Sequence, residues 1–523
     1  MISDASTAES TVSTNNLTVL ILAAGYGRRM GPFSRMINKS LVPYGDKPLI
    51  SHIIDKFPKA TTKFVIACGH MGQQVKDYVS TVHNDKCVVF VDIPDYSEAN
   101  TGPATTIQHC AQHILNGFMW ISCDTLFEFN YEDKLDHNWI GVYPVDSHLA
   151  KDYCWVERNG EDIELCHNKV PSDKAVDAFI GLMYCKDDQY LDQLIGVQAR
   201  ETPHGFFNLD LKAHTVRQWL DFGTYEKWQA INSKMQENSF VKPDEIFYHD
   251  NGRVIKYFSK EEHVQSRIRR AQANPECVPA NMQGVGNFLV HDWSDGDILY
   301  NQITPELFRK MLNWCDRNIW VDPEIDENTY PLCEKFYRDK TLERINQFRV
   351  KYADWSECCV VNRKEVDSID EYLSRIDWDW LCKKRDWRWI HGDLHFDNMV
   401  YNSATDKFTV IDWRTDFAGS VYGDVYYDLA KLLGGIWLNY RAIKDHAYEY
   451  VDRNDYATIE IPSVDNAQVY EDILQGFVAK QGLDWRKVKL LVPLIYLNMS
   501  PLHEAPFDKF LIALAQLHFS QVL

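Results

Sequence analysis

LTVLILAAGYGRRM, residues 17–30, is the stretch that decides the fold of the first half of this chain. Its first seven residues form an apolar run of the length of a buried strand, and Gly25 and Gly27 follow shortly after it. A buried strand that leads into a glycine-rich turn is typical of the first strand–helix unit of a parallel sheet. Glycines let the backbone turn tightly and bring its N–H groups against phosphate oxygens. The stretch therefore predicts an α/β domain with an anion-binding turn.

The alternation of strand and helix patterns continues downstream of this turn. Helical patterns occupy residues 48–57, 71–82 and 103–114, and the apolar strand patterns between them occupy residues 63–68, 87–93 and 118–123. Such alternation requires right-handed crossovers and produces a mostly parallel, doubly wound sheet. We predict such a domain over residues 17–237. Residues 1–16 are polar and rich in Ser and Thr, so we expect a disordered tail there.

The pattern changes in the second half of the chain. Strand patterns at residues 245–250 and 253–258 are separated by Asn251-Gly252, which predicts a hairpin because Asn-Gly favours the tight type I′ turn. A helical pattern, a further strand pattern and a long helix-rich region follow. A small β-rich lobe followed by a larger helical lobe is the outline of a protein-kinase-like fold. We therefore predict an α+β bilobal domain over residues 238–523.

Composition and charge restrict the class of protein. A chain of 523 residues is too long for one ordinary domain, and its net charge of -20 argues against a nucleic-acid partner. Nucleotide sites stay compatible with this charge, because a few local cations reverse the field. No apolar run has the length of a membrane span, and the 13 cysteines lack metal-binding spacing. We expect a cytoplasmic protein with reduced thiols and no membrane partner; a homo-oligomer stays open.

Five motifs in the first half occur in the order found in the sugar-nucleotidyltransferase family, which residues 17–235 resemble. The glycine-rich motif contains Leu22, Ala23, Ala24, Gly25, Gly27 and Arg29, and Lys39 follows it in the pattern K-x-L-x-P-x-x-x-K-P-L-I. The other motifs contain Thr101 and Gly102, then Asp124, then Lys169, and finally Asp221. Two residues depart from the family pattern: Asn38 stands where Pro is common, and Cys123 where Gly often precedes the aspartate.

The resemblance implies a role for each motif. The glycine-rich backbone and the loop at Thr101 and Gly102 would bind a nucleoside triphosphate, Arg29 and Lys39 would neutralise its phosphates, and Lys169 would hold an acceptor phosphate. Asp124 and Asp221 would hold Mg²⁺. The acceptor phosphate would attack the α-phosphorus and release pyrophosphate, a reaction that needs aligned polyanions and stabilised charge. The alternative is a domain of the same fold that is catalytically dead.

A second motif lies at residues 389–398, WIHGDLHFDN, and is followed by TVIDWR at residues 409–414. In this H-G-D-x-x-x-x-N pattern Asp393 would orient the attacking hydroxyl or accept its proton, and Asn398 and Asp412 would hold Mg²⁺ across the phosphates of ATP. The strings resemble the choline-kinase/aminoglycoside-phosphotransferase superfamily, over roughly residues 240–520. An ordinary surface loop is the alternative, although it would seldom concentrate two histidines, two aspartates and an asparagine.

Two further residues belong to this second site. Lys256 lies on a predicted strand, as the ATP-phosphate lysine of kinases does, although a strand lysine can also be an outward-facing charge. No glycine-rich loop precedes it, and its glutamate partner is not identified. Arg414 stands where choline kinases tend to carry an acidic residue. A cation beside the acceptor favours an anionic or neutral hydroxyl substrate over a trimethylammonium group.

The two predicted sites together suggest consecutive reactions. A kinase makes the phosphomonoester that a nucleotidyltransferase consumes, as in the choline kinase and phosphocholine cytidylyltransferase pair that activates substituents of bacterial surface polysaccharides. By this resemblance we favour ATP and CTP as nucleotides and a small alcohol or amino alcohol as acceptor. A sugar kinase joined to a sugar-1-phosphate nucleotidyltransferase is a second interpretation. A regulatory protein with one inactive site is a third.

Overall fold

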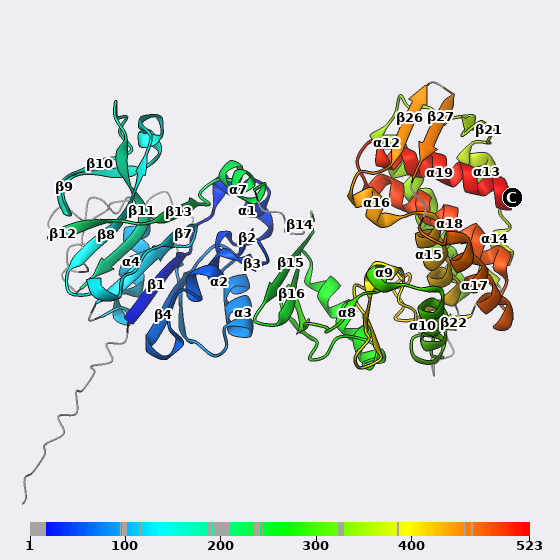
Figure 1. The fold of residues 1–523 in the computed structure, drawn as a ribbon, viewed down its shortest axis with the longest axis horizontal. Coiled ribbons are helices and arrows are strands. Elements are labelled where there is room, and N and C mark those ends of the chain that lie inside the picture. Colours follow the sequence, from blue (N-terminus) through cyan, green and yellow to red (C-terminus); the bar gives the residue numbers. More distant parts are fainter. Residues whose placement is uncertain are drawn as a thin grey trace, which may run out of the picture. The chain divides into compact units, whose positions relative to one another are not determined.

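The computed structural model describes residues 17–94, 96, 102–115, 117–186, 191, 210–234, 241–242, 244–322, 329–383, 386–453, 455–461 and 464–523. The chain forms two compact units (Figure 1). The first comprises Met1–Glu261 and Gly284–Val290, and the second comprises Glu262–Gln283 and His291–Leu523. The predicted tail, residues 1–16, and the predicted boundary at residues 237 and 238 lie outside the described residues. The domain limits stay a prediction.

A nine-stranded sheet forms the centre of the first unit, as far as the described residues show, in the order β5-β4-β1-β6-β11-β8-β12-β10-β9. Strands β5, β4, β1 and β6 are parallel, and β11 runs antiparallel to β6. The strands are β1 Leu17–Ala23, β4 Thr62–Cys68, β5 Cys87–Asp92, β6 Phe118–Ser122, β8 Asn138–Val145, β9 Cys154–Asn159, β10 Asp162–Asn168, β11 Val176–Cys185 and β12 Leu211–Thr215. Two short pairs accompany it, β2 Pro43–Tyr44 with β3 Lys47–Pro48 and β7 Thr125–Glu128 with β13 Gln218–Asp221.

Helices cover both faces of this sheet, because neighbouring residues of a buried strand point to opposite sides. Val19 and Ile21 of β1 share a core with α2 and α3, whereas Leu20 shares a different core with α4. The helices of this unit are α1 Phe33–Met36, α2 Leu49–Ile54, α3 Gly72–Val82, α4 Pro103–Cys110 and α7 Tyr225–Asn232. The doubly wound prediction is confirmed.

A five-stranded sheet also belongs mainly to the first unit. Its strands are β14 Val241–Lys242, β15 Glu245–Asp250, β16 Arg253–Phe258, β17 Gln283–Val285 and β18 Phe288–Asp292. The predicted hairpin is confirmed: Asp250 pairs with Arg253, and Asn251 and Gly252 have φ of 50° and 71°. The sheet packs on α3, where the ring centroid of Tyr78 lies 5.6 Å from that of Tyr248.

Helices dominate the second unit, and its strands are short. Its helices are α8 Glu261–Ala273, α9 Leu299–Gln302, α10 Pro305–Asn318, α11 Tyr330–Glu334, α12 Lys340–Lys351, α13 Ile369–Arg375, α14 Trp378–Lys383, α15 Val425–Trp437, α16 Tyr440–Lys444, α17 Ala467–Lys480, α18 Trp485–Met499 and α19 Phe507–Val522. Its strands are β19 Asp297–Ile298, β20 Val360–Val361, β21 Lys364–Glu365, β22 Trp387–Arg388, β23 Met399–Asn402, β24 Lys407–Val410, β25 Gly423–Asp424, β26 Glu449–Arg453 and β27 Tyr456–Glu460. Within the described ranges, no helix is both long and apolar enough to span a membrane.

The hydrophobic core of the second unit surrounds α15. This helix is buried on nearly every side and packs against α17 and α18. The strands β23 and β24 form a hairpin, and the segments that precede and follow it carry the predicted kinase motif. A single hydrophobic cluster joins the hairpin to α15, because Met399 and Val410 are buried in the same core as Leu429 and Leu432.

Candidate active sites

A pocket of about 640 Å³ lies where β1 and β6 end in the first unit. It brings together residues that are far apart in the sequence. Eight predicted residues line it: Leu22, Ala24, Gly25, Gly27, Arg29, Lys39, Gly102 and Asp124. Ala23 is buried at the end of β1, and Thr101 lies outside the described residues. Tyr26, Arg28 and Ser122 also line the pocket, and the sequence analysis missed them.

The glycine turn is shaped for close approach of a ligand. Gly27 has a φ of 65°, in the left-handed region that favours glycine, and its carbonyl oxygen accepts a hydrogen bond from the backbone N–H of Met30 at 2.8 Å. A Cβ atom added at Gly25 would meet no atom within 4 Å. A side chain there would therefore extend into open space, which glycine leaves to a ligand. Arg29 follows the turn and is exposed beside the pocket.

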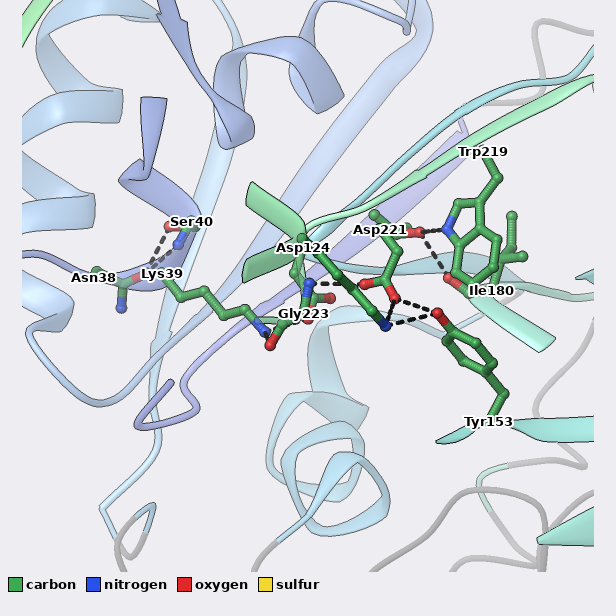
Figure 2. Close-up of polar contacts among 11 residues, drawn as sticks. Asn38, Lys39, Ser40, Asp124, Tyr153, Ile180, Trp219, Asp221 and Gly223 are labelled. Atoms are coloured by element: carbon green, nitrogen blue, oxygen red, sulfur yellow. Dashed lines mark hydrogen bonds and ion pairs between the residues drawn. The ribbon is translucent and has the colours of Figure 1, made fainter. Parts of the chain in front are cut away.

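Lys39 and Asp124 form an ion pair within the pocket (Figure 2). Burial raises the pKa of the Asp124 carboxyl, but the charge of Lys39 and hydrogen bonds with Lys39 and Ser122 outweigh burial and hold that pKa below its ordinary value. Asp124 is therefore ionised at neutral pH. Cys123 beside it is buried, which raises the pKa of its thiol to about 12 and keeps it protonated.

Asp221 lies close to Asp124, with Gly223 between their carboxylates (Figure 2). A Cβ atom at Gly223 would lie 2.8 Å from Oδ1 of Asp221 and 3.7 Å from Oδ2 of Asp124. The two aspartates meet because Asp221 ends β13 opposite Thr125, the residue that follows Asp124. The structure thus brings together the two carboxylates predicted to hold a metal.

Two residues that the sequence analysis missed hold Asp221. The hydroxyl of Tyr153 and the ammonium group of Lys227 donate hydrogen bonds to Oδ2 of Asp221, at 2.7 Å and 2.5 Å. Lys227 lies in the first turn of α7, directly after the motif of Asp221, so its position in the sequence could have indicated a contact with Asp221. Tyr153 gave no such signal.

Lys169 follows β10, and its backbone N–H donates a hydrogen bond to the carbonyl oxygen of Tyr153 at 3.1 Å. Its side chain is exposed and its φ is 54°. The backbone contact connects Lys169 to the tyrosine that holds Asp221. Its role as the residue that binds the acceptor phosphate stays a proposal.

The donor set of the first site suits Mg²⁺. Among the described residues no three His, Cys, Asp or Glu side chains cluster as a metal cage. Mg²⁺ rarely needs one, because it is commonly held by one or two carboxylates together with substrate phosphates and water. Asp124 and Asp221 could supply the two carboxylates, and Lys39 and Lys227 balance their charge in the structure.

In the second unit, His391 supports the predicted catalytic loop from within. It is fully buried; its Nε2 lies 2.7 Å from the carbonyl oxygen of Ile411, and its Nδ1 accepts the N–H of Asp393 at 3.1 Å. The tautomer with the proton on Nε2 satisfies both bonds. Burial lowers the pKa of His391 to about 3, so the ring is neutral at physiological pH.

Asp428 of α15 holds the same loop by its backbone. Its carboxylate accepts the N–H groups of His391 and Gly392 at 2.7 Å and 2.6 Å, and the indole N–H of Trp320 at 3.0 Å. Burial raises the pKa of Asp428 to about 6, against the lowering effect of these bonds. Asp428 therefore positions the loop rather than taking part in chemistry.

Asp393 pairs with Lys431 of α15, whose Nζ lies 2.6 Å from Oδ1 of the aspartate. Burial raises the pKa of Asp393, but the charges of Lys431 and His395 outweigh burial and hold it well below its ordinary value. Lys431 was missed in the sequence analysis. Asn398 donates its amide to the carbonyl oxygen of Asp393 at 2.9 Å, which leaves its Oδ1 as the atom suited to a cation.

Asn398 and Asp412 lie at the same end of the β23–β24 hairpin. The backbone N–H of Ile411 donates to the carbonyl oxygen of Asn398 at 3.0 Å, and Asp412 follows directly. Asp412 is exposed and has a φ of 60°. A non-glycine residue in this region is strained, and such strain clusters at functional sites. An amide oxygen and a carboxylate so placed fit Mg²⁺, and they would hold an ion that balances the charge of the ATP phosphates.

The contacts of two further predicted residues, Lys256 and Arg414, do not by themselves assign a catalytic role. Lys256 lies on β16 in the first unit, is buried, and has its ammonium nitrogen 5.8 Å from the ring centroid of Phe247. Its role at ATP stays a proposal. Arg414 donates its backbone N–H to the carbonyl oxygen of His391 at 3.1 Å, so it is anchored beside the catalytic loop.

Comparison with known proteins finds two family models that match separate parts of the chain. The model of the MobA-like NTP transferase domain matches residues 19–131, and the model of the phosphotransferase enzyme family matches residues 285–461. The bifunctional protein GlmU of Methanococcus vannielii is 26% identical over 132 residues, which cover 25% of this chain and 30% of that protein. Mannose-1-phosphate guanyltransferase of Gibberella zeae is 25% identical over 119 residues, which cover 22% of this chain and 32% of that protein. The chain thus spans about a third of the length of these curated relatives.

Solved structures also resemble part of the chain. UDP-glucose pyrophosphorylase from Acinetobacter baumannii matches with a TM-score of 0.36 and 15% identity, over 41% of this chain and 91% of that one. HddC from Yersinia pseudotuberculosis matches with a TM-score of 0.34 and 19% identity, over 41% and 97%. The two family matches confirm the predicted resemblances. The chain therefore combines an N-terminal MobA-like NTP transferase domain with a C-terminal domain of the phosphotransferase enzyme family, the architecture of a fused nucleotidyltransferase and kinase.

Proposed function

We propose that the chain phosphorylates a small alcohol or amino alcohol with ATP and then transfers a nucleotidyl group, CMP from CTP, to the new phosphate. Pyrophosphate leaves in the second step. The strongest support is the pocket in which Gly25, Lys39 and Asp124 face the same space. A triphosphate there would meet backbone N–H groups, a lysine and a carboxylate that can share a metal ion.

The kinase step is supported by the contacts of the catalytic loop. Asp393 is ionised and its loop is held by His391 and Asp428, so the carboxylate is positioned to orient a hydroxyl or accept its proton. Mg²⁺ held by Asn398 and Asp412 would neutralise the phosphates of ATP during transfer. The phosphomonoester formed is the nucleophile that the first domain requires.

The wider proposal is that the product, a nucleotide-activated alcohol, serves surface polysaccharide decoration, and that the enzyme works in the cytoplasm. The 13 cysteines support a reducing compartment, because none of them forms a disulfide within the described residues. A second candidate is a sugar kinase coupled to a sugar-1-phosphate nucleotidyltransferase. The name of the Gibberella zeae relative, a mannose-1-phosphate guanyltransferase, favours this route.

The test is to incubate the full chain with ATP, each of CTP, UTP, GTP and dTTP, and a panel of alcohols, amino alcohols and sugars, and to identify the products by mass spectrometry. A nucleotide-activated alcohol formed with CTP supports the first candidate, and a nucleotide sugar supports the second. In assays that supply the phosphorylated acceptor as well as the alcohol, Asp393→Asn should remove ATP consumption alone, and Asp124→Asn should remove pyrophosphate release alone. Loss of both activities in either variant would contradict two separate sites.

A further inference from the structure

Two cations in the second unit lie against the same aromatic ring. The ammonium nitrogen of Lys340 is 3.8 Å from the ring centroid of Phe336, and Cζ of Arg414 is 5.2 Å from it. Phe336 belongs to a π-helical turn, Lys335–Asp339, which leads directly into Lys340. Turns of this kind are rare and are found frequently at functional sites. We call Lys340 and Arg414 the cation pair.

No carboxylate of the described part of the chain forms an ion pair with either member of the cation pair. Neither residue forms an ion pair there, and Nε of Arg414 donates only to the backbone carbonyl oxygen of Asp416, at 3.4 Å. The carboxylate of Asp416 instead accepts hydrogen bonds from Gly419 and Thr415 in its own loop. Burial lowers the pKa of Lys340 well below its ordinary value, the charges of Arg414, Arg344 and Lys431 lower it further, and the charge of Asp416 offsets only part of this lowering. An anion bound between Lys340 and Arg414 would offset both the burial of the charged lysine and the repulsion between the cations.

The cation pair lies beside Asp393, the residue proposed to orient the acceptor hydroxyl or accept its proton. A Cβ atom added at Gly392 would lie 2.9 Å from Cδ of Arg414, so the arginine side chain packs on the backbone next to Asp393. Lys431, whose charge acts on Lys340, contacts Asp393 itself. An acceptor with its hydroxyl at Asp393 would thus have a second group within reach of the pair.

The ring of Phe336 is already contacted by the two cations of the pair. A quaternary ammonium group is recognised by open faces of aromatic rings, but Phe336 is contacted by the protein's own cations. A trimethylammonium acceptor would therefore meet two positive charges where it needs an aromatic cage. The net charge of the chain, -20, makes such a local excess of cations more notable.

We propose that Lys340 and Arg414 bind an anionic group, a carboxylate or a phosphate, on the hydroxyl compound that the kinase domain phosphorylates. This inference rests on the proposed kinase function and narrows its acceptor class. The charged pair would then discriminate acidic alcohols from neutral and cationic ones, because electrostatic complementarity contributes specificity more than affinity.

The test compares matched acceptors in the full chain with ATP. Glycerate and glycerol 3-phosphate are the acidic compounds, glycerol is the neutral one, and ethanolamine and choline are the cationic ones. ADP release should show a kcat/KM at least tenfold higher for one acidic compound than for glycerol. Lys340→Met and Arg414→Met should each lower this ratio at least tenfold. Lys335→Met, which removes an exposed charge from the same π-helical turn, should leave the ratio unchanged.

Equilibrium binding of the acidic compounds, measured by calorimetry in the presence of ATP with Asp393→Asn, separates the possible failures. One outcome is that Asp393→Asn binds an acidic compound, that adding Lys340→Met or Arg414→Met abolishes this binding, and that the unsubstituted chain shows no turnover. This outcome would support the anion site and reject the kinase function. Turnover of choline or glycerol that ignores both substitutions would reject the anion site and retain the kinase. Absence of both binding and turnover would overturn both. Thermal unfolding of each variant shows whether it has folded.

Discussion

The side-chain amide of Asn38 donates a hydrogen bond to the carbonyl oxygen of Ala23 at 3.0 Å. The same nitrogen reaches the carbonyl oxygen of His70 at 2.6 Å, and the side-chain oxygen accepts the N–H and hydroxyl of Ser40. Asn38 is fully buried. It thus joins the start of the glycine turn to the segment that presents Lys39. This departure from the family pattern has a structural role that proline could not fill, because proline has no side-chain donor.

Asn38→Ala is therefore expected to affect both stability and chemistry. It leaves buried carbonyl and N–H groups without partners, which costs about 1–3 kcal/mol, and it loosens the position of Lys39. Denaturant unfolding should show the loss of stability, and pyrophosphate release should fall at least tenfold while ATP consumption is unchanged. Asn38→Asp keeps the bonds from Ser40 but loses the donor, so its effect should be intermediate. Unchanged pyrophosphate release in Asn38→Ala would reject the bracing role.

Alanine substitutions at the two glycines of the turn should affect different properties: Gly25→Ala should weaken nucleotide binding, and Gly27→Ala should lower stability. Gly25→Ala meets no neighbouring atom, so we expect unchanged stability and at least a tenfold higher KM for the nucleotide used by the first domain. Gly27 has a φ of 65°, and alanine in the left-handed region costs about 1–2 kcal/mol. Gly27→Ala should therefore lower the midpoint of unfolding. A normal KM in Gly25→Ala would show that the ligand does not approach the turn there.

Lys431→Met should change how the kinase reaction depends on pH. Asp393 must be ionised to act, and the charge of Lys431 is the largest influence that lowers its pKa. Without that charge the pKa of Asp393 rises, so the acid limb of the kcat/KM profile should move to higher pH by at least one unit. Lys444→Met, on the neighbouring α16, is the control and should leave the limb in place. An unmoved acid limb in Lys431→Met would mean that Asp393 does not control the rate.

His391 should make the chain less stable in mild acid. Burial lowers its pKa in the folded state from 6.5 to about 3, so the unfolded chain binds a proton that the folded chain does not between these values. This contribution to stability is fully present above pH 6.5 and is lost as the pH falls, by about 2 kcal/mol at pH 5. Denaturant unfolding at pH 7.5 and 5.0 measures it.

His391→Gln provides the comparison for this pH effect. Glutamine can bond but does not titrate, so the variant should lose less stability than the wild type between the two pH values, although it is less stable at pH 7.5. Equal losses in both proteins would show that His391 does not titrate as its surroundings require.

Much of the fold and of the two candidate sites could be predicted from local sequence patterns. The first strand was predicted at its observed bounds, and the hairpin at Asn251-Gly252 formed as expected, because strand length and turn type depend on neighbouring residues. The glycine turn and the H-G-D loop were located for the same reason: their residues act within a few positions of one another. Eight of the predicted residues of the first site line one pocket.

Contacts between distant segments decided the rest. Nothing near Asp221 in sequence indicates Tyr153, and nothing near Asp393 indicates Lys431, because each pair meets only when separate elements pack together. The partnership of Lys340 with Arg414 likewise exists only because packing brings both cations against the ring of Phe336. The sequence by itself thus determined which short motifs bear the chemistry and in which order they occur. Packing of strands and helices decided which charges face one another, since a side chain's electrostatic surroundings depend on distance in space.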